Sequence, residues 1–175
     1  NKIGVLDADI HGPCIPKMLG LKGQKLKGDK KGEFSPVTGS LGIKVASMDF
    51  LLENDETPVI WRGPLKMRLI QQFISDIAWG ELDYLFVDLP PGTGDEPLSV
   101  MQLIPDMDGV VIVTMPSEVS EAVVKKSVTF AKQVGIPVIG IVENMSGFVC
   151  PECGKKIDIF KSGGGKRITQ KLDVP

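Results

Sequence analysis

The sequence has 175 residues, of which 42% are hydrophobic and 24% are charged, and 20 basic side chains nearly balance 22 acidic ones to leave a net charge of −2. The balanced charge disfavours a protein that binds nucleic acid through bulk electrostatics, and the apolar content excludes a disordered chain. No apolar run approaches the roughly 18 residues that a membrane-spanning helix needs. We therefore expect one globular domain over residues 1–175, with neither a nucleic acid nor a membrane as its partner.

The three cysteines, Cys14, Cys150 and Cys153, are too few for a disulfide framework and suit a reducing cytosol. The chain opens directly on a strand-like run and shows no secretory signal, so we expect a cytoplasmic protein. Because its first residue is Asn1 and not Met, we also expect the natural chain to begin further upstream.

Short apolar runs predict the strands of the fold, and capping residues predict its helices. In chain order, the runs that we interpret as strands are residues 3–6, 41–48, 84–88, 109–115 and 137–142. Residues 20–40 are rich in Gly and Lys and predict an exposed loop or an edge hairpin. Pro64 is typical of the first position of a helix and Ser117 of a helix cap, and a last helix is expected to follow the glycine run at 163–165.

Two of the predicted helices have apolar residues that recur on one face. The face of the first helix comprises Leu65, Leu69, Phe73 and Ile77. The face of the second comprises Val119, Val123, Phe130 and Val134. We expect both faces to pack against the sheet.

Strands that are apolar on both faces and alternate with helices indicate an α/β fold with a doubly wound, mostly parallel sheet. Folds of this class bind their ligands beyond the carboxyl ends of the strands. Three predicted strand ends carry polar side chains, namely Asp7–Asp9, Asp88–Pro90 and Glu143–Asn144. The functional site is therefore expected at these strand ends.

The segment Asp88–Asp95, D-L-P-P-G-T-G-D, carries the strongest chemical signal. A hydrophobic strand that ends in Asp and leads into a glycine-bearing loop is how P-loop nucleotidases present the acid on the magnesium side of the nucleotide. Asp88 could hold a water of Mg²⁺, and Gly92 would let a backbone N–H approach a γ-phosphate. The alternative is an ordinary Pro-Gly turn in which Asp88 caps a helix.

Asp7 and Asp9 form a second candidate, because two carboxylates two residues apart at a strand end suit Mg²⁺ binding and the positioning of water. Taken alone, such a pair is more often a turn cap, and only the neighbouring Asp88 loop favours a functional interpretation. Asn144 follows the strand at 137–142, where its amide could read adenine through a donor and an acceptor. A helix cap or a turn is the alternative for Asn144.

Cys150 and Cys153 form a C-x-x-C pair within a loop that we place at about residues 146–160. Two thiolates at this spacing can chelate one soft metal ion or an iron–sulfur cluster, but they are only half of a ligand set. Two chains related by a two-fold axis would supply all four. A thioredoxin-like redox pair and a surface turn without metal are the alternatives.

Taken together, these motifs resemble the Mrp/ApbC family, which are MinD/ParA-like P-loop ATPases that carry iron–sulfur clusters. The resemblance covers nearly the whole chain and keeps the order of the family's motifs. Its segments are Asp7–Pro13, Trp61–Pro64, Asp88–Asp95, Glu143–Ser146 and Cys150–Cys153.

For the nucleotide site, the resemblance implies that Asp9 is the first switch acid, near the attacking water and Mg²⁺, and that Asp88 is the Walker B acid. Gly92 matches the glycine of the second switch, and Asn144 matches the asparagine that reads adenine. The family's Walker A loop has no counterpart in residues 1–175 and would lie before Asn1. By itself, the chain is therefore expected to bind ATP poorly and to be inactive.

For the metal site, the resemblance implies that Cys150 and Cys153 bridge a 4Fe–4S cluster across a homodimer. Arg62 and Lys66 lie in a family motif whose role the sequence does not explain. The implied function is a slow, Mg²⁺-dependent ATPase that assembles iron–sulfur clusters or delivers them to recipient apo-proteins. A partitioning or positioning ATPase of the ParA/MinD kind and a zinc-bridged, non-enzymatic scaffold are the alternatives, since zinc also accepts four thiolates.

Overall fold

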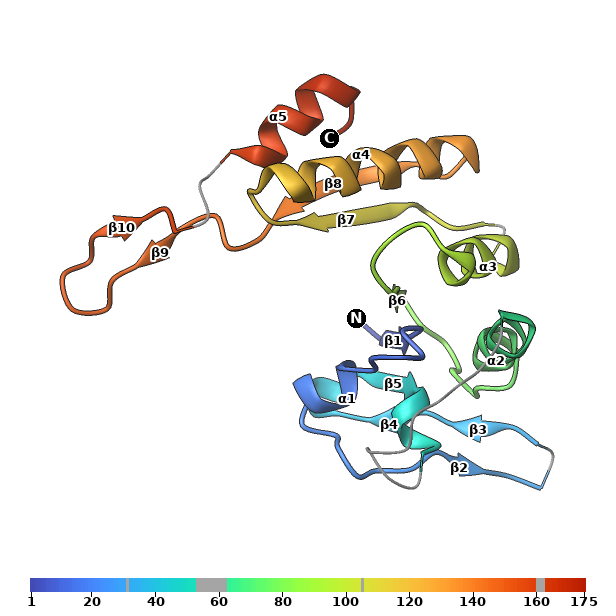
Figure 1. Ribbon diagram of the computed structural model, residues 1–175. Coiled ribbons are helices and arrows are strands. Elements are labelled where there is room, and N and C mark those ends of the chain that lie inside the picture. Colours follow the sequence, from blue (N-terminus) through green and yellow to red (C-terminus); the bar gives the residue numbers. More distant parts are fainter. Residues whose placement is uncertain (31, 53–62, 105, 160–162) are drawn as a thin grey trace. The chain divides into compact units, whose positions relative to one another are not determined.

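The computed structural model describes residues 1–30, 32–52, 63–104, 106–159 and 163–175 (Figure 1). The contacts of the chain divide it into two compact units, Asn1–Leu103 and Ile104–Pro175, and each unit is described by itself. The expectation of one domain over residues 1–175 remains a prediction.

The N-terminal unit is built on a four-stranded sheet in the order β4-β5-β1-β6. Its strands are β1 (Ile3–Asp7), β4 (Val37–Thr38), β5 (Lys44–Ser47) and β6 (Tyr84–Asp88). β1 runs parallel to both β5 and β6, whereas β4 is antiparallel to β5. The predicted strand at 41–48 begins only at Lys44, because Ser40–Gly42 form a 3-10 turn in which Leu41 has a φ of +60°.

The described helices of this unit are α1 (Ile15–Met18), α2 (Gly63–Ser75) and α3 (Asp95–Leu103), and a second 3-10 turn spans Met48–Phe50. α2 begins one residue before Pro64 and buries Leu69 and Phe73, as predicted. Leu65 was expected on the same face but is 53% exposed. The buried stripe of α2 runs through Ile70 instead, which is 1% exposed.

A two-stranded hairpin, β2 (Lys27–Gly28) with β3 (Phe34–Ser35), confirms the edge hairpin predicted within residues 20–40. This segment is not exposed throughout, however, because its two ends reach the core. One core cluster of the unit comprises Leu21, Val37, Val45 and Phe50, with Ile15, Leu26 and Ile43 packed against it.

β6 lies at the edge of its four-stranded sheet and is more exposed than its apolar sequence predicts. Tyr84 and Phe86 are 54% and 56% exposed, and their rings stack with centroids 6.2 Å apart. The apolar run predicted this strand correctly, but it did not predict that the strand lies at the edge of the four-stranded sheet.

In the C-terminal unit, β7 (Val110–Thr114) and β8 (Val138–Glu143) form a parallel pair, and α4 (Glu118–Gln133) and α5 (Gly164–Leu172) pack against it (Figure 1). Ser117 caps α4 as predicted, since its Oγ accepts a hydrogen bond from the N–H of Ser120 at 3.2 Å. The α/β fold with a mostly parallel sheet, predicted from the alternation of strands and helices, is thereby confirmed.

The predicted apolar face of α4 is wrong. Val119 and Val123 are 79% and 46% exposed, whereas Val124 and Val128 are nearly fully buried beside Ile168 of α5. The helix carries two apolar stripes of similar spacing, so periodicity alone does not select the one that packs. Docking of α5 selects the stripe through Val128.

A second hairpin, β9 (Phe148–Val149) with β10 (Lys156–Ile157), forms a separate two-stranded sheet, drawn in orange in Figure 1. Its connecting turn contains Cys150 and Cys153, so the C-x-x-C pair lies at the tip of a hairpin and not at the start of a helix. This placement argues against the thioredoxin-like alternative. In the described part of the chain, no helix combines the length and the apolar character needed to cross a membrane.

Gly109, just before β7, tests how closely the β7–β8 pair is packed. Its φ is +155°, and a Cβ on it would lie 2.6 Å from the carbonyl oxygen of Pro137. We expect Gly109→Ala to lower the free energy of unfolding by about 3 kcal/mol, because the backbone before β8 must move. Gly135, with a φ of +77° and no atom within 4 Å of a Cβ, is the matched control, and Gly135→Ala should cost only about 1 kcal/mol. Chemical denaturation measures both changes, and equal losses would contradict the packing argument.

Candidate functional site

Parallel pairing brings the predicted acids of β1 and β6 to the same edge of the sheet. Asp7 and Asp88 are register partners, and Asp7 is also in register with Ser47 of β5. The chain stays paired one residue further, since the N–H of Ala8 donates to the carbonyl oxygen of Asp88 at 2.8 Å. Asp9 follows directly, so the three carboxylates belong to two adjoining strand ends, as the sequence predicted.

Asp7 is fully buried and is held by several donors. Its Oδ2 accepts hydrogen bonds from the Oγ of Ser47 at 3.1 Å and from the backbone N–H of Ile15 at 3.2 Å. Burial is the largest influence on its acidity and raises its pKa from 3.8 to about 6, in spite of the hydrogen bonds that favour the carboxylate. Asp7 therefore connects the end of β1, within the protein interior, to Ser47 of β5 and to the backbone at Ile15.

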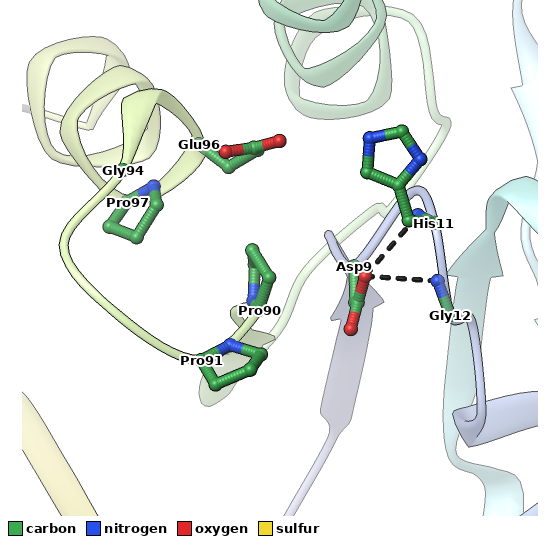
Figure 2. Close-up of a pocket in the computed structure, with 8 residues that line it drawn as sticks. All are labelled: Asp9, His11, Gly12, Pro90, Pro91, Gly94, Glu96 and Pro97. Carbon is green, nitrogen blue, oxygen red and sulfur yellow. Dashed lines mark hydrogen bonds between the residues drawn. The ribbon is translucent and has the colours of Figure 1, made fainter. Parts of the chain in front are cut away.

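Asp9 is more accessible and shapes the turn that follows β1. Its Oδ1 accepts hydrogen bonds from the backbone N–H groups of His11 at 3.2 Å and of Gly12 at 3.0 Å (Figure 2).

Burial raises the pKa of Asp88, and the charge of Asp9 raises it further. Repulsion between carboxylates at one sheet edge is relieved by a cation, and carboxylate oxygens are ligands that Mg²⁺ accepts. Asp9 and Asp88 are therefore candidate ligands for Mg²⁺ by the chemistry of their carboxylates.

A pocket of about 490 Å³ opens beside Asp9 (Figure 2). Its lining residues are Asp9, His11, Gly12, Pro90, Pro91, Gly94, Glu96 and Pro97. Gly92 lies in the loop between β6 and α3, which also contains Pro90, Pro91 and Gly94. Its φ is +107°, and no atom lies within 4 Å of a Cβ built on it. A glycine in this conformation with open space around it leaves its backbone accessible to a ligand.

Lys66 in α2 pairs with Glu96 in α3, a contact that was not predicted from the sequence. Their Nζ and Oε1 atoms lie 2.6 Å apart, and the two side chains are only 17% and 13% exposed. The bond to Lys66 is the main cause of the lowered pKa of Glu96. Lys66 stood out only as part of a motif with no known role, and its companions Trp61 and Arg62 lie outside the described residues.

Asn144, the predicted adenine reader, follows β8 in the C-terminal unit. Its N–H donates to the carbonyl oxygen of Thr114 at 2.8 Å, and its Oδ1 accepts from the N–H of Met145 at 2.9 Å. The side chain is exposed at the carboxyl end of β8. Its place at a strand end agrees with the prediction, and its role as a base reader stays a prediction.

Glu143, immediately before Asn144, is a capping residue that was not predicted from the sequence. Its carboxylate accepts hydrogen bonds from the N–H groups of Gly163 at 2.9 Å and Gly165 at 2.5 Å, at the start of α5. Those N–H groups lower the pKa of Glu143, as expected for an acid at a helix N-terminus. The Glu143 carboxylate therefore links the end of β8 to the start of α5, and the cysteine hairpin lies in the segment between these two points. The glycine run at 163–165 was the sequence signal that could have indicated this cap.

The turn between β9 and β10 closes on itself around Cys150. The N–H of Cys150 donates to the carbonyl oxygen of Lys155 at 3.0 Å, and the N–H of Gly154 donates to the carbonyl oxygen of Cys150 at 2.9 Å. Backbone N–H groups of Cys153 and then Glu152 donate to the Cys150 sulfur and lower the pKa of that thiol. A turn that stabilises a thiolate in this way is preorganised for a soft metal.

The described residues contain no group of three or more His, Cys, Asp or Glu side chains arranged to hold a metal ion. Cys150 and Cys153 are both free thiols and together offer two ligands. Cys14 lies in the N-terminal unit, where burial and the neighbouring acids, Asp88 first, raise the pKa of its thiol. A thiol that resists ionisation is a poor ligand, so we assign no ligand role to Cys14.

Asp7 yields a prediction on the pH dependence of stability. Its pKa of about 6 in the folded state lies above the ordinary value of 3.8, so its ionisation destabilises the fold progressively as the pH rises from about 4 to 7. Relative to the wild-type chain, Asp7→Asn should therefore gain about 3 kcal/mol between pH 4 and pH 8. Denaturant unfolding in EDTA at both pH values measures the gain. Asp106→Asn, at an exposed acid, is the control, and a constant difference between Asp7→Asn and wild type would refute the prediction.

A parallel sheet with acids and a glycine-bearing loop at adjoining strand ends is the architecture of a nucleotide-binding P-loop NTPase. The chain belongs to the ParA family, described as "NUBPL iron-transfer P-loop NTPase", which it matches over residues 1–175. The resemblance to the Mrp/ApbC-type ATPases is thereby confirmed at the level of the family.

Curated relatives cover almost all of the chain. It is 56% identical over 174 residues to the iron-sulfur cluster carrier protein of Saccharolobus solfataricus and 58% identical over 174 residues to that of Methanocaldococcus jannaschii. It is 48% identical over 180 residues to the cytosolic Fe-S cluster assembly factor CFD1 of Saccharomyces cerevisiae. Each match covers 99% of the chain but only 58%, 60% and 61% of the respective relative, so the chain spans about three fifths of their length.

A solved structure supports the fold. The nucleotide-binding protein from Archaeoglobus fulgidus, in complex with ADP, superposes with a TM-score of 0.83 at 43% sequence identity. The match covers 99% of this chain and 66% of that one. The P-loop NTPase-like fold that the sequence predicted is therefore confirmed.

Proposed function

We propose that the protein containing this chain is an ATP-hydrolysing iron–sulfur carrier. Its cargo would be a 4Fe–4S cluster, held between two subunits and passed to recipient apo-proteins. The observation that carries the proposal is the Cys150–Lys155 turn, in which backbone N–H groups stabilise a thiolate, in a chain whose family is that of iron-transfer NTPases. Relatives at 56% and 58% identity are named iron-sulfur cluster carrier proteins.

In the nucleotide half of the proposal, Asp9 and Asp88 would hold Mg²⁺, and the buried Asp7, in register with Asp88, would support their strand ends from the interior. Mg²⁺, when bound, neutralises charge on the phosphate oxygens. Asp9, oriented by the N–H groups of His11 and Gly12, positions the attacking water. Gly92 brings a backbone N–H to the γ-phosphate, and Asn144 reads the adenine edge.

In the cluster half, Cys150 and Cys153 supply two of the four thiolates that a 4Fe–4S cluster needs, and the same pair of a second subunit supplies the others. In a dimer with two-fold symmetry each subunit contributes the same pair of cysteines, so the site is self-complementary. Hydrolysis would bias the two switch loops between two arrangements and through them the geometry at the cysteines.

The test uses the full-length protein that contains this chain, purified without oxygen. Iron and sulfide are measured per chain, and the absorption spectrum is recorded. The loaded protein is then mixed with an apo-ferredoxin, with a chelator present to capture free iron, and with or without MgATP. The proposal expects cluster to reach the ferredoxin in spite of the chelator. Bound zinc that does not exchange for iron would support the scaffold alternative, and failure to hold iron would refute the proposal.

A further inference from the structure

The geometry points to Lys66 as a positioning residue for hydrolysis, which, through its ion pair with Glu96, fixes the loop at residues 89–94 that follows Asp88. This inference rests on the proposed ATPase function. It also assigns a role to Lys66, which the family resemblance leaves unexplained.

The ion pair is sheltered from solvent. The Nζ of Lys66 lies 2.6 Å from Oε1 of Glu96, and the side chains are 17% and 13% exposed. Exposed ion pairs contribute little, but removing one partner of a sheltered pair leaves a charge that is poorly solvated. Holding this pair together is therefore worth more than holding a surface pair such as Lys2–Glu81, whose side chains are 62% and 89% exposed.

The pair lies where it can control the loop. Lys66 is in the first turns of α2, Glu96 is the second residue of α3, and these two helices pack against each other. The loop at 89–94 connects β6 to α3, and its β6 end is already fixed by pairing of Asp88 with Asp7. The Lys66–Glu96 bond fixes the other end, so that both ends of the loop are anchored to packed elements.

Glu96 also touches the loop and the pocket directly. A Cβ placed on Gly94 would lie 3.4 Å from Oε2 of Glu96, so this oxygen lies against the loop backbone. Glu96 lines the pocket that contains Asp9 and His11, and Figure 2 shows its carboxylate directed toward the side on which His11 lies. With Oε1 bonded to Lys66, the carboxylate is held in one orientation.

Fixing the loop should matter for the chemical step more than for binding. The loop contains Gly92, which the proposed mechanism places at the γ-phosphate, whereas Asn144, the proposed base reader, lies outside it. Displacement of reacting groups by about 1 Å can cost up to about 100-fold in rate. Loss of the anchor is therefore expected to lower kcat about tenfold and to change KM by less than about twofold.

The experiment uses the full-length protein with Lys66→Met, Glu96→Gln and the exchanged double variant Lys66→Glu/Glu96→Lys. Steady-state MgATP hydrolysis gives kcat and KM, and hydrogen exchange of the peptide covering residues 89–97 is followed without nucleotide. Both single variants should lose kcat and exchange faster over 89–97, and the double variant should recover most of both properties. Lys2→Met, which breaks the exposed pair, should change neither.

The possible results separate this inference from the function on which it rests. An unchanged kcat in Lys66→Met, or a double variant no better than the singles, would overturn the positioning role. If the wild-type protein hydrolyses no ATP, the proposed function fails, and hydrogen exchange alone decides the anchor. Unchanged exchange over 89–97 in Lys66→Met would then refute it.

Discussion

Replacing Cys150 by Ser is expected to abolish the proposed metal centre and to weaken the proposed dimer. The hydroxyl of Ser ionises far less readily than a thiol, so the N–H groups of Glu152 and Cys153 would no longer face a thiolate. With two ligands per chain, loss of one leaves an incomplete set on each subunit. Cys153→Ser should have the same effect, because each chain then keeps only one of the two thiols of its C-x-x-C pair.

The measurement combines iron per chain with the mass from sedimentation, both under anaerobic conditions. Wild-type protein should contain about one centre per two chains, and dimer formation should depend on the metal through mass action. Cys14→Ser is the matched control, since it removes a cysteine of the N-terminal unit and should leave the centre in place. A monomer with a full complement of metal, or a Cys150→Ser protein that retains it, would refute the bridging model.

The strand ends could be predicted because each depends on a local pattern. An apolar run that ends in Asp fixes both a strand and the place of its carboxylate, and parallel pairing then brings Asp7 and Asp88 into register. The same logic located Asn144 beyond β8. To predict the position of each of these residues, it was enough to predict its own strand and to apply the general rule for parallel sheets.

The residues that sequence reasoning missed depend on contacts between distant segments. Glu96 pairs with Lys66 across 30 positions, and Glu143 caps a helix that begins 21 positions later. Each is an ordinary surface acid when judged by its neighbours in sequence. The packed stripe of α4 was misassigned for a related reason, because docking of α5 against Val128 decides between two similar stripes.

Replacing Asp88 by Asn is expected to lower MgATP hydrolysis by the full-length protein about 100-fold. The variant loses the charge through which Asp88 would hold Mg²⁺, although its shape is nearly unchanged. The fold should survive, because the contact of this residue with β1 runs through its backbone, from the N–H of Ala8 to the carbonyl oxygen of Asp88. Hydrolysis is measured over a range of Mg²⁺ concentrations, together with thermal unfolding in EDTA.

The rate of hydrolysis and the unfolding temperature should not fall together. Burial and the charge of Asp9 raise the pKa of Asp88, which means that its ionised form is disfavoured in the metal-free fold. Asp88→Asn removes that charge, so the variant should unfold at the same temperature as the wild type or a higher one while its hydrolysis falls. A folding defect would lower both, and Asp106→Asn, at an exposed acid, should alter neither. Undiminished hydrolysis by Asp88→Asn would remove this carboxylate from the site, whereas lost activity with a lowered unfolding temperature would assign it a structural role.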